Sequence, residues 1–112
     1  MIRNTMETTI YENLHGGSGK VEIRTKINQD DKVKGLKLFA EVTLMPHSSI
    51  GYHYHRDEAE GYYITEGSGV FIDHNEERKE VRTGDLCLIT KGQSHGIENV
   101  TNNELKFIAI VY

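Results

Sequence analysis

Three histidines and one glutamate stand at spacings that would let them share a metal ion. His53 and His55 are two residues apart, so in an extended strand both imidazoles project from the same face. Glu60 follows after a short charged bend, and His95 begins a second strand-like run much further along the chain. Imidazole nitrogens and a carboxylate oxygen form a ligand set that suits divalent manganese, iron, zinc, nickel, cobalt or copper. The sequence therefore predicts a site for one divalent transition metal ion.

The elements that would position these residues are β-strands. Apolar and polar residues alternate through 36–44 and 21–27, which is the period of a half-buried strand. Further strands are expected at 8–14, 50–55, 61–66, 69–72, 77–82, 86–90, 95–99 and 105–111. Glycine-, asparagine- and aspartate-rich turns separate them, and no segment has a helical period longer than a turn. This pattern predicts an all-β sandwich or small barrel.

Length and composition narrow the possible functions. At 112 residues the chain is expected to form one domain, residues 1–112. Its 13 basic and 17 acidic side chains argue against a nucleic-acid or anionic-membrane partner, because no basic stripe offsets the net charge of -4. A single cysteine, Cys87, excludes an intrachain disulfide, and no apolar run has the length of a signal-peptide core or membrane helix. We therefore expect a cytoplasmic protein that binds a small molecule.

Two expected strands, 86–89 and 107–111, are apolar on both faces. A strand in a lone sandwich keeps one face in water, so these two need cover on the outer face as well. A domain of this size also buries only roughly two thirds of its unfolded surface. An N-terminal strand or a second subunit could supply the cover. We favour the second subunit, which predicts a homodimer.

The segments that carry the candidate ligands resemble the two motifs of the cupin superfamily. The first motif lies in 51–67, and its matching residues are His53, His55, Glu60 and Gly67. The second lies in 84–99, and its matching residues are Gly84, Gly92, His95 and Asn99. Two positions depart from the family pattern: Thr90 replaces a proline, and His47 stands where a glycine opens the first motif. Both departures fall at turns, so they bear on local backbone shape and not on the ligands.

The resemblance implies a single-domain cupin jelly roll, which is a double-stranded β-helix barrel. N-terminal strands and a loop would occupy 1–35, and the conserved barrel would occupy 36–112. The ion would lie inside one mouth of the barrel, and its protein ligands would be His53, His55, Glu60 and His95. Water or substrate would complete the coordination, as in catalytic sites and unlike closed structural ones. The alternative is that His53 and His55 are exposed strand residues and that His95 is a hydrogen-bonded core histidine. It fits less well with four candidate ligands in register with the two motifs.

Tyr62 is the candidate catalytic residue. It shares strand parity with Glu60, as does Ile64, so both side chains should face the pocket. The phenol of Tyr62 could donate a proton or a hydrogen bond to a substrate oxygen. Equally, its ring could do no more than fill the barrel.

Five other residues have weaker cases. Glu58 competes with Glu60 for the ligand role, although Glu60 has the better spacing to the motif glycine. His47 could lie near the mouth, and Gln93 could reach its rim, but solvent exposure accounts for both. His15 stands in a glycine-rich turn and is interpreted as part of a flexible turn or a contact of a terminal arm. Cys87 is flanked by leucines and is expected to be an inert, buried side chain.

Two classes of function remain open for such a site. The first is a small metalloenzyme acting on a sugar or carboxylate as an isomerase, lyase or decarboxylase, or, with iron, as a dioxygenase. The second is a binding or sensory module that uses the metal to hold a small ligand without turnover. Sensor cupins are usually fused to a DNA-binding domain, and this chain has no helix-turn-helix segment. We favour the enzyme over the binding module. A third possibility, a metal-bound structural protein without turnover, agrees less well with open coordination positions.

Overall fold

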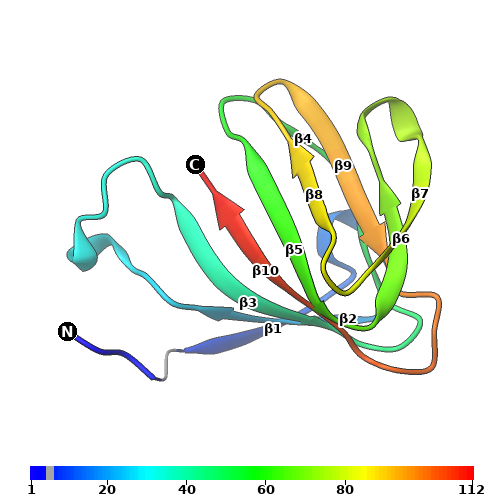
Figure 1. Cartoon of the computed structure of the whole chain (residues 1–112), viewed down its shortest axis with the longest axis horizontal. Helices are drawn as coiled ribbons and strands as arrows, with labels where there is room; N and C mark the ends of the chain where they lie inside the picture. The colour runs from blue at the N-terminus through cyan, green and yellow to red at the C-terminus, as the bar shows by residue number, and fades with distance from the viewer. Residues whose placement is uncertain (5–6) are drawn as a thin grey trace.

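The computed structural model describes residues 1–4 and 7–112, which form two antiparallel β-sheets that face each other (Figure 1). The six-stranded sheet has the order β1 (Thr8–Glu12), β2 (Lys20–Thr25), β3 (Leu38–Leu44), β10 (Leu105–Val111), β5 (Glu60–Glu66) and β8 (Leu86–Ile89). The four-stranded sheet has the order β4 (Ser49–His55), β9 (Gln93–Glu98), β6 (Ser68–Ile72) and β7 (Arg78–Arg82). Three short 3-10 turns are η1 (Leu14–Gly16), η2 (Gln29–Asp31) and η3 (His74–Glu76). The all-β prediction is confirmed, and no helix in the described part of the chain is long and apolar enough to cross a membrane.

The period-two pattern of the sequence corresponds to inward- and outward-facing side chains. On β10, every second side chain from Leu105 to Val111 is buried, and the strand pairs with β3 on one side and β5 on the other. On β3 the buried side chains are Ala40, Val42 and Leu44. The strand begins at Leu38, so Leu36, which was expected to belong to it, precedes it in a loop. These central strands form one wall of the barrel interior.

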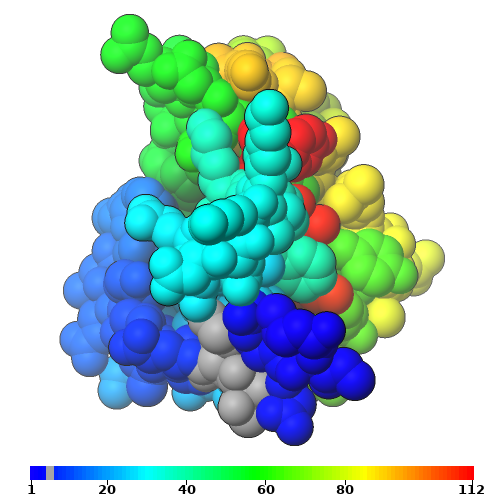
Figure 2. Space-filling view, turned by 90° about the vertical axis from the view of Figure 1, so that its left-hand side faces the viewer, coloured from blue at the N-terminus to red at the C-terminus, as the bar shows by residue number. Residues whose placement is uncertain are grey.

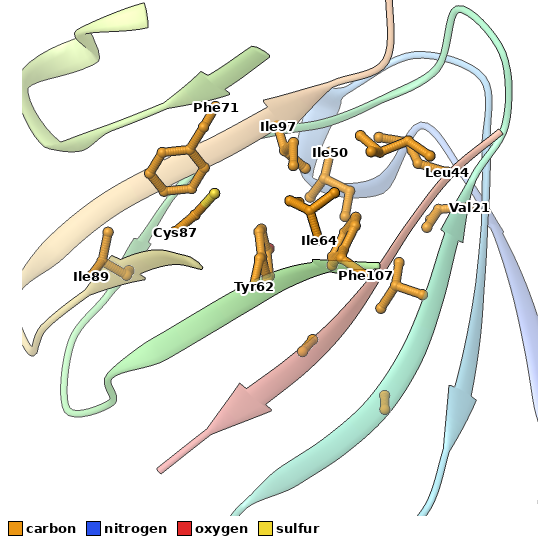
Figure 3. Close-up of a cluster of buried hydrophobic side chains, with 14 residues drawn as sticks. Val21, Leu44, Ile50, Tyr62, Ile64, Phe71, Cys87, Ile89, Ile97 and Phe107 are labelled. Carbon is orange, nitrogen blue, oxygen red and sulfur yellow. The ribbon is translucent and has the colours of Figure 1, made fainter. Parts of the chain in front are cut away.

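The core lies where the inner faces of the two sheets meet (Figure 3). The ring of Tyr62 on β5 lies 4.5 Å from that of Phe107 on β10 and 6.3 Å from that of Phe71 on β6, measured between centroids. Cys87 is buried beside them, and burial raises the pKa of its thiol to about 12. The thiol therefore stays protonated at neutral pH, which agrees with the expectation of an inert, buried cysteine.

The asparagine that closes the second motif joins two turns at the end of the barrel away from His55. Asn99 is buried, and its carboxamide nitrogen donates to the carbonyl oxygens of Leu44 at 3.0 Å and Asn103 at 2.7 Å. Its carboxamide oxygen accepts a hydrogen bond from the backbone N–H of Thr101 at 3.0 Å. The turn after β9 is therefore held against the end of β3 by one side chain.

The segment between β2 and β3 crosses one side of the molecule, with the N-terminal residues beneath it (cyan and blue in Figure 2). The Arg3 guanidinium donates to both carboxylate oxygens of Asp31, at 2.7 and 2.8 Å. This pairing holds the pKa of Asp31 at about 2. At the other end of the segment, the ammonium of Lys37 lies 3.5 Å from the carboxylate of Glu58. These contacts hold the start of β3, which carries Leu38 toward the interior.

Candidate metal centre

The structure brings the four sequence-predicted ligands together inside the barrel. His53 and His55 lie on β4, His95 lies on β9, and Glu60 begins β5 on the opposite sheet. His53 and His95 are direct neighbours in the antiparallel pairing of β4 with β9. One ligand atom from each of the four residues lies within 4.8 Å of the others. The site thus bridges the two sheets.

The distances between ligand atoms fit a shared ion. The Oε1 atom of Glu60 lies 2.9 Å from Nε2 of His95 and 3.1 Å from Nε2 of His55. The two Nε2 atoms are 3.1 Å apart. Metal–nitrogen and metal–oxygen bonds of this kind are about 2.0–2.2 Å long, so two ligands at right angles around one ion lie about 3 Å apart. The donor types and their spacing therefore suit a divalent transition metal ion.

Hydrogen bonds donated by the outer ring nitrogens, Nδ1, turn two of the imidazoles inward. Nδ1 of His53 donates to the carbonyl oxygen of Gly51 at 2.6 Å, so its Nε2 carries the free lone pair. Nδ1 of His55 lies 3.4 Å from Oε1 of Glu58 and can donate to that carboxylate. Glu58, the rival ligand, thus faces the outer side of His55, where it orients the ring instead of joining the cluster.

Burial sets the protonation of the site. His95 is fully buried between the ring of Tyr62, at 4.9 Å, and that of Phe71, at 5.8 Å between centroids. Burial lowers the pKa of His95 to about 3 and that of His53 to about 4, and it raises the pKa of Glu60 to about 7. Both imidazoles are therefore neutral at neutral pH, in the form that binds metal. Near neutral pH, a proton on Glu60 therefore competes with a metal ion.

Metal affinity is expected to fall as the pH drops below about 7. A carboxyl group with a raised pKa is protonated below that pKa, and its proton must leave before the oxygen can bind a cation. We expect a loss that approaches about tenfold per pH unit as the pH falls from 7 to 5. Competition for manganese(II) between the protein and a chelator, measured from pH 5 to 8, checks this. A constant affinity over that range would contradict it.

A cavity of about 200 Å³ adjoins the ligand cluster and is lined by His53, His55 and Glu60, among others. Tyr62 also lines it, is 3% exposed, and places its hydroxyl oxygen 3.4 Å from Nε2 of His95. The predicted inward direction of Tyr62 is therefore confirmed. Ile64 also points inward, but it is fully buried in the core and does not line the cavity.

Sequence reasoning missed His15. Its ring stacks on that of His53, with centroids 3.8 Å apart and planes 12° apart, and it lines the cavity. The interpretation of His15 as part of a flexible turn or as a terminal-arm contact was wrong. The loop of η1 packs against β4 where Gly17 meets Gly51, a contact between distant segments that no local spacing signals. A glycine beside the His-x-His pair is the only sequence feature that hints at it.

Two other weak candidates use their side chains in turns: His47 lies apart from the site, and Gln93 lies beside His55 in the pairing of β4 with β9. His47 precedes β4, at the opposite end of that strand from His55, and its Nε2 donates to the Asn102 side-chain oxygen at 2.6 Å. The suggestion that it lies near the mouth was wrong. The side-chain oxygen of Gln93 accepts a hydrogen bond from the backbone N–H of Thr90 at 2.9 Å, so it closes its own turn.

The same contacts explain the two departures from the family motifs. Thr90 uses its backbone N–H as the donor to Gln93, and a proline at this position would have no such donor. His47 has a φ of 55°, which is the left-handed region that a glycine adopts most readily. Thr90 and His47 can therefore form the turns in which the family has a proline and a glycine.

The chain is similar in sequence and structure to known proteins. A family model described as the cupin domain matches residues 40–111. An oxalate-binding protein of Thermotoga maritima is 39% identical over 99 residues, which are 88% of this chain and 81% of that protein. A crystal structure described as that of a predicted oxalate decarboxylase, also from Thermotoga maritima, has a TM-score of 0.92 and 36% identity and covers 99% of this chain and 97% of that one. The polyketide cyclase RemF of Streptomyces resistomycificus has a TM-score of 0.77 at 20% identity, covers 99% of this chain and 79% of its own, and shares the fold.

Proposed function

This chain belongs to the cupin domain family, and from that membership and its converging ligands we propose that it binds one divalent transition metal ion and uses it to bind and convert a small carboxylate. The observation that carries the proposal is the meeting of His53, His55, Glu60 and His95 at a cavity large enough for a ligand. The same donors suit manganese, iron, zinc, nickel or cobalt. When bound, such an ion polarises a carbonyl or carboxylate oxygen. The relatives' names, oxalate-binding protein and predicted oxalate decarboxylase, support a carboxylate as the ligand.

Tyr62 is the proposed catalytic residue. Burial and the nearby Glu60 raise the pKa of its phenol well above the ordinary value of 10. The phenol is therefore protonated at neutral pH and acts as a donor toward a substrate oxygen in the cavity. His53, His55, Glu60 and His95 would hold the ion that orients the same substrate.

Tyr62→Phe is expected to lower turnover by about a hundredfold or more while metal content is unchanged, because only the donor hydroxyl is lost. The measurement is a rate assay of metal-loaded protein together with its metal-to-protein ratio. Tyr63→Phe is the matched control, since Tyr63 points outward from the same strand. Full activity of Tyr62→Phe would remove this tyrosine from the mechanism.

The proposed function is tested by loading the purified protein with each of the five metals and following oxalate by ¹³C NMR. A decarboxylase converts hydrogen oxalate into formate and carbon dioxide, a balanced reaction in which the carbon–carbon bond breaks and a carbon–hydrogen bond forms. A panel of other small carboxylates follows in the same assay. A protein that takes up no metal, or that neither binds nor converts any of these acids, would overturn the proposal.

Binding without turnover is the second candidate function. It is favoured by the cavity, whose walls beyond the ligands, Tyr62 and His15 are apolar and offer no further acid or base. Calorimetry separates the two functions, because a binding module gives a stable, stoichiometric complex with unchanged ligand. An enzyme consumes the ligand.

We also propose that the protein is a homodimer. On the outer face of the six-stranded sheet, Leu86, Leu88 and Tyr63 are exposed, and Ile108 and Ile110 lie beside them in the strand register. An apolar strip of this kind is typical of subunit interfaces. Cover by a second copy would satisfy the doubly apolar strands noted in the sequence.

Light scattering at micromolar concentration is expected to give twice the chain mass of 12.8 kDa. Leu88→Lys places a charge in the apolar strip and is expected to shift the protein to the monomer. Tyr54→Lys, on the exposed face of the other sheet, is the control and should stay dimeric. A monomeric wild-type protein would contradict the prediction.

A further inference from the structure

We infer that the ligand of this site is a small 2-oxo acid with a short, branched apolar substituent. Its carboxylate and adjacent carbonyl oxygen would face the ion, and its substituent would lie against the apolar wall of the cavity. The inference rests on the proposed function, since it assumes that the four residues hold a metal ion. It goes beyond that function by naming the class of acid.

The cavity has two chemically different walls. All the polar lining residues come from η1, β4 and β5: His15, His53, His55, Glu60 and Tyr62, with Leu14 and Ile50 as the apolar residues of these elements. The lining residues of β2, β3 and β10 are all apolar: Ile23, Leu38, Val42, Phe107, Ala109 and Val111. Val111 is the register partner of Glu60, so the apolar wall begins directly beside a metal ligand. A molecule bound at the ion therefore meets hydrocarbon a few atoms away.

The charges around the cavity favour a single carboxylate. No lysine or arginine lines it in the described part of the chain. A dianion such as oxalate would turn its outer oxygens toward the apolar wall, where no donor satisfies them, and burying such oxygens is costly. An alkyl group in their place gains from burial on the same wall. The ion would then be the only positive charge at the cavity, enough for one carboxylate, and it would bind the carboxylate oxygen and the neighbouring carbonyl oxygen of a 2-oxo acid.

The size of the cavity agrees with a substituent of a few carbons. Its volume is about 200 Å³. At about 30 Å³ for each water in the liquid, this is the space of roughly six or seven waters, more than the open positions of one ion need. Ala109, the smallest side chain of the apolar wall, is 2% exposed and lies between Phe107 and Val111 on β10, which leaves room for a branched chain.

The test is calorimetry of the manganese(II)-loaded protein with three acids of increasing apolar size: oxalate, pyruvate and 4-methyl-2-oxopentanoate. We expect 4-methyl-2-oxopentanoate to bind on the order of tenfold tighter than pyruvate, because its added carbons are buried on the apolar wall. Oxalate is expected to bind more weakly than 4-methyl-2-oxopentanoate.

A matched pair of variants locates the effect on the wall. Val111→Thr keeps the shape of the side chain but places a hydroxyl in the cavity, and is expected to reduce the preference for 4-methyl-2-oxopentanoate over pyruvate to about threefold or less. Val100→Thr makes the same chemical change at an exposed residue outside the cavity and should leave the preference unchanged.

The outcomes separate this inference from the proposed function. Either oxalate or pyruvate could bind at least as tightly as 4-methyl-2-oxopentanoate. That result would overturn the assignment to a 2-oxo acid with an apolar substituent, while metal-dependent carboxylate binding would stand. If the loaded protein binds none of the three acids, this inference fails, and the proposed function fails with it only if the wider panel of carboxylates is also neither bound nor converted. If the preference is present but survives Val111→Thr unchanged, the assignment of the substituent to this wall is overturned.

Discussion

His95→Ala is expected to abolish retention of the divalent ion. His95 is fully buried, and its Nε2 lies 2.9 Å from the Glu60 carboxylate and 3.1 Å from Nε2 of His55, at the centre of the ligand cluster. Loss of groups that only support a ligand typically costs ten- to a hundredfold in metal affinity, so losing the ligand should cost at least about a hundredfold. Mass spectrometry of metal content after dialysis is the measurement.

Two further variants show whether the loss is specific. His53→Ala removes a ligand that is only half-buried, so it should give the same loss of metal with a smaller effect on folding. His47→Ala removes an exposed histidine at the opposite end of β4 and should keep full metal content, as should Cys87→Ser. Retention of the ion by both His95→Ala and His53→Ala would show that these imidazoles are not its ligands.

Gly51→Ala is expected to destabilise the protein by about 2–4 kcal/mol, the range of severe overpacking. A Cβ at this position would collide with the carbonyl oxygen of His15 and would lie 2.8 Å from the backbone nitrogen of Gly17. Both neighbours are backbone atoms, so the η1 loop as a whole would have to move. The carbonyl oxygen of Gly51 also accepts the hydrogen bond that orients His53. A displaced loop should therefore weaken metal binding as well.

Thermal unfolding of the metal-free protein measures this effect. A loss of this size corresponds to a Tm lower by about 10–20 °C for a domain of this length. Gly61→Ala is the control, because its added methyl would meet a side-chain atom of Leu86 at an ordinary 3.5 Å. A Gly51→Ala protein with the same Tm as the wild type would mean that the η1 loop does not pack on β4 as described.

The sequence alone determined the parts of the molecule that depend on local backbone geometry. Successive side chains of a strand point to opposite faces, so the alternation in 36–44 was enough to predict which of its residues face inward. The two-residue spacing of His53 and His55 put their rings on one face for the same reason. The order of ligands and turns along two motifs then predicted the fold and the residues that meet inside it.

The tertiary structure decided every feature that depends on contacts between distant segments. His15 reaches His53 only because Gly17 and Gly51 let two backbones approach closely, and neither glycine signals this approach by its spacing. Glu58 orients a ligand instead of being one, because the bend before β5 turns it to the outer nitrogen of His55.

The two unlike walls of the cavity also belong to the tertiary structure. The ligand cluster comes mainly from β4 and β9 of one sheet, and the apolar wall comes from β2, β3 and β10 of the other. Val111 belongs to a strand that is apolar on both faces, so the sequence did not show that its side chain points inward or what it faces there. That depends on how two sheets pack, which is a property of the whole barrel and of no single strand.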